Sequence, residues 1–146
     1  MKYRREVELN VKRIKNCLER AKTATNHWDS VGNMYYACYH SMVAAIWAKQ
    51  KFNESEFGTA HVKVLDTYIR LYSRTKGNNI SKEKKVEKAV KRWKNLRVDA
   101  DYYIFTADFE DKNLASTEEE TLKMEEFATS HITHLENLLK PTQTST

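Results

Sequence analysis

An arginine on an apolar helix face is the first sign of chemistry in this sequence. In the helical stretch expected over about residues 82–104, Arg97 follows Trp93 by four positions and Val90 by seven. At about 100° per residue, these three side chains share one face. A guanidinium directed at a core or an interface is costly unless hydrogen-bonding groups receive it. Asp101, one turn further on, is the nearest candidate partner.

The expected central helix, about residues 27–50, offers two further partners for this arginine. They are Tyr36 and His40, either of which could complete the set around Arg97. One interpretation is a buried Arg97–Asp101 pair that fixes packing, and the other is a site in which Arg97 receives a phosphate. The residue types alone leave both interpretations open.

A dense basic run precedes Arg97 on the same stretch and lies away from its apolar face. Such a run is usually a solvated surface, and the alternative is a phosphate-binding strip. Lys94 is a separate candidate binding residue. The run consists of Lys84, Lys85, Lys88, Lys91 and Arg92.

Acid and base candidates for RNA cleavage are few. Metal-free cleavage needs a base, a positive charge for the phosphorane and an acid, so Arg97 would supply the charge. The base or acid would come from His40, His61 or Tyr102. A tyrosine with an ordinary pKa near 10 is a poor base at neutral pH, and a histidine in a tyrosine-rich core helix also fits a purely structural role. The spacing of His131 and His134 is a weak metal signal, and we expect no metal or cofactor.

Composition bounds the class of protein. The chain has 146 residues, of which 40% are hydrophobic and 31% charged, with three Gly, one Pro and a net charge of +5. So few glycines and prolines argue against an all-β fold, and the proportions of hydrophobic and charged residues argue against a disordered chain. We expect one domain over residues 1–140 and a disordered tail over 141–146. No apolar run reaches the roughly 20 residues of a membrane span, and no secretory signal is recognisable, so we expect a cytoplasmic protein with two reduced, buried cysteines.

Apolar periodicity predicts an all-α bundle of five helices, over about residues 2–23, 27–50, 59–74, 82–104 and 117–140. The second has almost no polar side between Met34 and Trp47, which is typical of a central helix. Asn26 is expected to cap it, Ser81 to cap the fourth helix, and Thr117 to open a capping box with Glu120.

Three elements together resemble the HEPN family (higher eukaryotes and prokaryotes nucleotide-binding). The stretch over residues 33–41, NMYYACYHS, resembles the central-helix signature, and Thr59-Ala60-His61 resembles the Thr-His element of the next helix. Residues 96–102, LRVDADY, match the Arg-x-x-Ala-Asp-Tyr element of that family. The order and spacing agree over nearly the whole chain.

The resemblance implies an antiparallel helical bundle that forms a two-fold homodimer, with Arg97 near the interface. Catalytic members are metal-independent ribonucleases in which a histidine follows the arginine after four to six residues. Positions five to seven after Arg97 are Tyr102, Tyr103 and Ile104, so that pair is incomplete here. In members paired with a minimal nucleotidyltransferase, a tyrosine near the arginine can be adenylylated, and Tyr102 or Tyr103 resembles such an acceptor.

Two functions follow from the resemblance. The first is a ribonuclease toxin or defence effector, with Arg97, Asp101, Tyr102 and His40 as catalytic candidates in a dimer cleft and with Tyr36, His61 and Lys94 as binding candidates. The second is a catalytically silent module that binds a nucleotide or pairs with a minimal nucleotidyltransferase. The expected partners are a second copy of the chain, RNA or a nucleotide, and a nucleotidyltransferase or an antitoxin.

Overall fold

The five expected helices are present, and within the described part of the chain there is no strand. The computed structural model describes residues 1–49, 61–72, 80–102 and 114–141. The helices are α1 (Arg4–Thr23), α2 (His27–Ala48), α3 (His61–Tyr72), α4 (Ile80–Tyr102) and α5 (Leu114–Leu139). None of them is both long enough and apolar enough to cross a membrane, as far as the described residues go.

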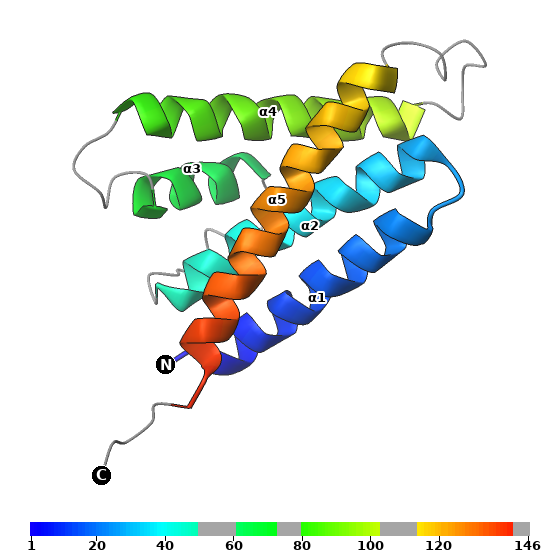
Figure 1. Ribbon diagram of the computed structural model, residues 1–146. Helices are drawn as coiled ribbons and strands as arrows, with labels where there is room; N and C mark the ends of the chain where they lie inside the picture. Colours follow the sequence, from blue (N-terminus) through cyan, green and yellow to red (C-terminus); the bar gives the residue numbers. More distant parts are fainter. Residues whose placement is uncertain (50–60, 73–79, 103–113, 142–146) are drawn as a thin grey trace.

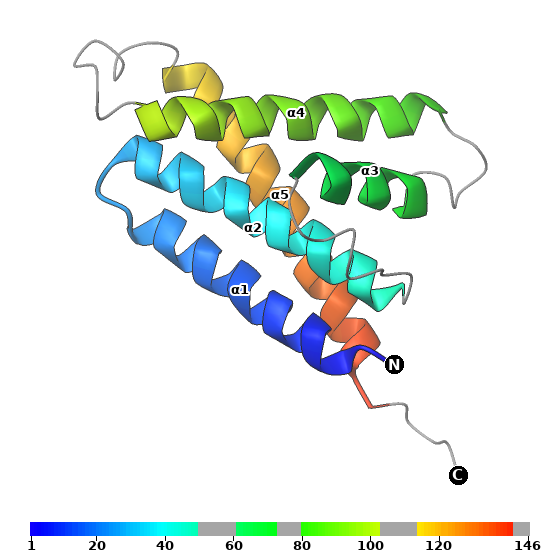
Figure 2. The ribbon, with the colours of Figure 1, turned by 180° about the vertical axis from the view of Figure 1, so that it is seen from behind.

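The second helix is central, as its composition predicts. It contacts each of the other four helices. It runs antiparallel to α1, with α3 and α4 on its other side, and α5 crosses α1 and α2 on one face (Figures 1 and 2). Asn26 caps it as expected, because its side-chain oxygen accepts a hydrogen bond from the backbone N–H of Trp28 at 2.8 Å.

Small side chains on α2 allow its neighbours to approach closely. Ala37, Ser41 and Ala44 are all fully buried. The Ser41 hydroxyl is satisfied within the helix by donating to the carbonyl of Ala37 at 2.7 Å. The Cys38 thiol is within 3.3 Å of the Met124 carbonyl of α5, and both cysteines of the chain are buried and free, as predicted.

Three details at helix ends differ from the sequence-based expectation. Helix α4 begins at Ile80 and α5 at Leu114, so Ser81 and Thr117 lie inside helices and cap neither. Residues 114–116 are also helical, so α5 begins almost one turn before the predicted capping box. The local sequence does not exclude this earlier start. Leu138 follows the buried Leu135 by three residues, a step that predicts an inward position, but it is 44% exposed because it lies in the last turn of α5. Of the expected tail over residues 141–146, Pro141 is described and exposed, and residues 142–146 lie outside the described part of the chain.

Candidate functional site

Arg97 is held against the tyrosines of the central helix. Its guanidinium donates a hydrogen bond to the Tyr36 hydroxyl at 3.1 Å. The guanidinium carbon lies 5.7 Å from the centre of the Tyr36 ring and 5.8 Å from that of Tyr35. These distances are within the range of cation–π attraction. Arg97 is partly buried, Tyr35 is buried and Tyr36 is 36% exposed, so the group sits where the core meets solvent.

Helix geometry explains why these three side chains meet. The apolar face of α4 buries Val90 and Trp93 in the core. Arg97 lies on the same face, two turns after Val90 and one turn after Trp93, and so contacts α2. Tyr35 and Tyr36 are consecutive, so their side chains leave the helix about 100° apart around its axis. The Tyr35 ring therefore enters the core while the Tyr36 ring stays at the surface. Burial raises the pKa of the Tyr35 phenol, while the charge of Arg97 acts in the opposite direction.

A cleft opens beside this group, with a volume of about 530 Å³. Tyr36 is on its wall, and so is Ala100, which follows Arg97 by three residues on α4. Arg97 is not among the residues that line the cleft, but it contacts one of them, Tyr36. The lining residues come from the end of α1, the start of α2 and the end of α4: Arg20, Thr23, Ala24, Thr25, Trp28, Asp29, Gly32, Asn33, Tyr36 and Ala100.

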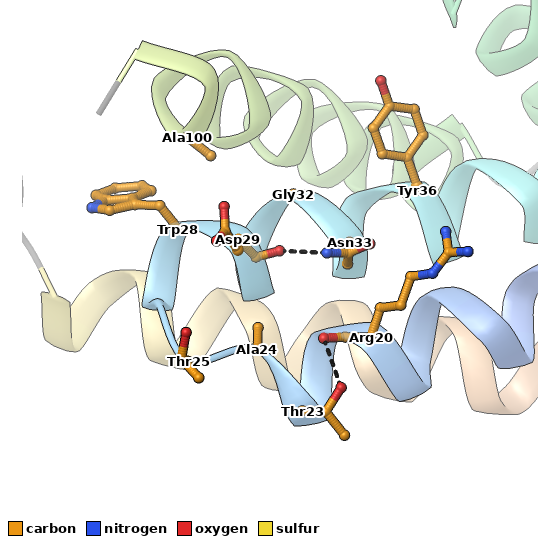
Figure 3. Close-up of a pocket in the computed structure, with 10 residues that line it drawn as sticks. All are labelled: Arg20, Thr23, Ala24, Thr25, Trp28, Asp29, Gly32, Asn33, Tyr36 and Ala100. Atoms are coloured by element: carbon orange, nitrogen blue, oxygen red, sulfur yellow. Dashed lines mark hydrogen bonds between the residues drawn. The ribbon is translucent and has the colours of Figure 1, made fainter. Parts of the chain in front are cut away.

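Apart from Tyr36, the polar residues of this cleft were not predicted as site residues from the sequence. Arg20 reaches from α1 toward the turn of α2 that carries Tyr36, and Asp29 and Asn33 stand on the same side of α2 (Figure 3). The Asn33 amide donates to the Asp29 carbonyl at 2.8 Å. In the sequence Arg20 resembles any other exposed basic residue of α1. Arg20 differs from them because the turn over residues 24–26 brings the start of α2 alongside the end of α1, where Arg20 lies.

His40 is placed one turn beyond Tyr36 on α2, but its neighbourhood is unlike that of a general base. Its ring contacts the Tyr39 ring with centres 5.7 Å apart. Burial lowers the pKa of His40 to about 4, and the positive charge of Arg13 on α1 contributes to that shift. The structure therefore brings Arg97 together with Tyr36, and brings His40 toward α1.

The remaining predicted site residues lie at or near helix ends. Lys94 is partly buried on α4, one turn before Arg97. His61 is the first residue of α3, and Asp101 and Tyr102 are the last two of α4. The side chains of these three lie outside the described residues, as does Tyr103 entirely. The expected Arg97–Asp101 pair therefore stays a prediction.

His131 has a structural environment on α5. Its Nε2 is 2.7 Å from the Tyr68 hydroxyl and its Nδ1 is 2.7 Å from the Phe127 carbonyl, so both ring nitrogens are engaged. Burial lowers the pKa of His131, which favours the neutral ring. Across the residues with described side chains, no group of three or more His, Cys, Asp and Glu is arranged to hold a metal ion.

Comparison with known protein families, with curated proteins and with solved structures finds no match to this chain.

Proposed function

We propose that this chain is a HEPN-type helical module that binds RNA or a nucleotide through a phosphate held at Arg97. The observation that carries the proposal is the contact of Arg97 with Tyr35 and with Tyr36, which lines a cleft of about 530 Å³. The HEPN resemblance of the sequence agrees with this position, since Arg97 belongs to its Arg-x-x-Ala-Asp-Tyr element.

Phosphate is the ligand group that best fits such an arginine. A guanidinium presents a rigid fork of donors that matches two phosphate oxygens, and its charge is permanent at any physiological pH. Partial burial strengthens the attraction, because the effective dielectric near the protein surface is lower than in bulk water. The Tyr36 contact fixes the side chain before the ligand arrives, which reduces the ordering cost of binding.

Binding is better supported than cleavage. Efficient acid–base catalysis requires a group whose pKa lies near the operating pH. With a pKa of about 4, the His40 imidazole is uncharged at pH 7, so it is a weak base and is not in the imidazolium form that would act as the acid. The geometry of the described side chains therefore favours the silent module over the ribonuclease.

The test is binding of a fluorescently labelled RNA oligomer to the full-length protein, measured by anisotropy. We expect Arg97→Ala to weaken binding about tenfold to hundredfold, as expected for one charge-assisted contact of about 1.5–3 kcal/mol. Arg97→Lys keeps the charge but loses the fork, so an intermediate affinity is expected. Lys88→Ala is the matched control, because Lys88 is an exposed cation on the same helix.

The same samples distinguish the two functions. We expect the RNA to remain intact during incubation and the wild type to be tolerated on expression. Cleavage or growth arrest that Arg97→Ala abolishes, with folding retained, would replace the binding module by the ribonuclease. Equal affinities for Arg97→Ala and the wild type, or no binding by the wild type, would refute the proposal.

A further inference from the structure

A second pocket lies between α4 and α5, away from the cleft at the α1–α2 corner. Its volume is about 200 Å³, and it shares no described lining residue with that cleft. The first turns of α5 cross the second half of α4, and the first half of α4 runs away from this crossing (Figures 1 and 2). The pocket is lined from both helices by Lys85, Val86, Ala89, Val90, Trp93 and Phe127.

The walls of this pocket are apolar, and two of them are aromatic. The Trp93 and Phe127 rings meet edge to face, with centres 5.5 Å apart and planes at 72°. The indole N–H of Trp93 donates to Glu120 at 2.8 Å, so the rest of its ring presents carbon. The aliphatic side chains beside it on α4 present carbon as well. Such walls offer water few hydrogen bonds, so the pocket favours an apolar group over water.

The volume of the pocket suits a small ring system. A dry apolar cavity of about 150 Å³ accommodates benzene, so about 200 Å³ leaves room for a substituted ring or for two fused rings. An aromatic ligand also gains more than an alkyl chain of equal area, because aromatic rings attract one another beyond what burial of their surface provides. Trp93 and Phe127 are the rings that such a ligand would contact.

Lys85 adds a positive charge to this apolar pocket. It is exposed, and it forms no ion pair with a residue that the structure describes. Two later members of the same basic run are compensated, because Lys91 pairs with Glu87 and Arg92 with Glu120. A lysine stem can line an apolar pocket while its ammonium group stays in water. An anionic group at the mouth of the pocket would therefore meet an uncompensated cation.

We infer that this pocket binds a small aromatic carboxylate, with its ring against Trp93 and Phe127 and its carboxylate at Lys85. The inference goes beyond the proposed function, because it assigns a second site and a second class of ligand to another part of the molecule. It also gives one lysine of the basic run a role in binding that is separate from any phosphate strip.

The first experiment titrates the full-length, ¹⁵N-labelled protein with 2-naphthoate and follows the backbone and indole N–H signals by NMR. We expect a Kd on the order of 0.1–1 mM, which is ordinary for a ligand of this size. The shifts should centre on residues 86–93 and on the Trp93 indole. The uncharged 2-naphthamide, which has the same ring system, should bind about threefold to fivefold more weakly because it lacks the attraction to Lys85.

Two lysine variants test the role of the charge. Lys85→Gln should weaken 2-naphthoate about threefold to fivefold and leave 2-naphthamide within about twofold, since a solvent-exposed ion pair contributes modestly. Lys84→Gln is the matched control, because it removes the same charge from an exposed position on α4 that does not line the pocket. Its affinity for both compounds should stay within about twofold of the wild type.

Ala89→Leu fills the pocket without changing any charge. Ala89 is partly buried in the pocket wall, and leucine is a good helix former, so the variant should fold and bind 2-naphthoate at least about tenfold more weakly. Asn95→Leu places the same side chain at an exposed position of α4 outside the pocket and should bind like the wild type. Circular dichroism confirms that both variants fold.

Several results would overturn the inference. They are the absence of shifts at millimolar 2-naphthoate, equal effects of the two lysine variants, equal affinity for 2-naphthoate and 2-naphthamide, and shifts centred on Tyr36 instead of Trp93. Octanoate, an alkyl carboxylate, should bind more weakly than 2-naphthoate, and equal or tighter binding would refute the aromatic ligand. Each of these results leaves the phosphate site at Arg97 untouched, because Arg97 does not line this pocket.

Discussion

At the scale of single residues, the site depends on one cation and one histidine that the fold treats differently. The Arg97 guanidinium donates to the hydroxyl of Tyr36, a residue of the cleft wall, and lies near the rings of Tyr35 and Tyr36. His40, one turn away from Tyr36 on α2, is kept neutral by burial and by Arg13. The fold thus places a permanent cation against Tyr36 and keeps a titratable side chain uncharged.

The neutral state of His40 predicts a loss of stability in mild acid. The unfolded chain binds a proton near pH 6.5 and the folded chain only near pH 4, so the free energy of unfolding should fall as the pH drops between these values. The slope for one such group is at most about 1.4 kcal/mol per pH unit. His40→Gln should flatten this dependence, as measured by urea denaturation at pH 7, 6 and 5.

The control for that measurement is a histidine on the surface. His134 is exposed on α5, so His134→Gln should change the pH dependence much less than His40→Gln does. His131, whose pKa is also lowered by burial, should preserve part of the slope in every variant. If His40→Gln and the wild type lose stability in parallel, the assignment of His40 as a buried neutral base is wrong.

At the scale of elements, the Glu120 side chain links α5 to α4. Its side chain is only 14% exposed and accepts a hydrogen bond from the Trp93 indole N–H at 2.8 Å. It also pairs with Arg92 at 3.1 Å and with Lys123 at 3.6 Å. Because the buried Trp93 donor depends on it, this carboxylate contributes more than an exposed ion pair would.

Glu120→Ala should therefore destabilise the protein by about 1–3 kcal/mol, since it leaves the buried Trp93 N–H without this acceptor. Glu119→Ala is the matched control, because Glu119 is 72% exposed and pairs only weakly with Lys123 at 3.7 Å. Its effect should remain within about 0.5 kcal/mol. Urea denaturation followed by Trp fluorescence gives both values, and equal losses would contradict the attachment role.

At the scale of the whole molecule, α2 determines the arrangement because every other helix packs on it. The cleft forms where the α1–α2 corner and the end of α4 meet the first half of α2 (Figure 3). Large apolar side chains remain exposed on three helices of the described part, at Leu9, Tyr36, Leu122 and Leu138. They offer surface for association, although they do not by themselves define one patch.

We predict a homodimer in solution, as the HEPN resemblance implies. Size-exclusion chromatography with light scattering at micromolar concentration should give about twice the chain mass of 17.2 kDa. The Arg97→Ala variant should elute in the same way if the arginine serves ligand binding and not assembly. A monomer throughout a dilution series from tens of micromolar would count against the dimer.

The sequence by itself determined the helices and the central place of α2. Apolar side chains at three- and four-residue steps can be buried together only on a helix, as Val7, Val11, Ile14 and Leu18 are on α1. The position of Arg97 on an apolar face also followed from helical spacing, because that relation is local.

Only the tertiary structure decided which side chains share the cleft. Nothing in the spacing of α1 distinguishes Arg20 from its basic neighbours, and nothing in α2 shows that His40 is buried beside Arg13. Those relations depend on how two helices pack and on the turn that joins them. Likewise, Glu120 was expected at a helix N-terminus, but the fold begins α5 earlier and uses that carboxylate to bind Trp93. Local sequence fixes the face on which a side chain lies, whereas its partners across the bundle depend on the packing of the whole chain.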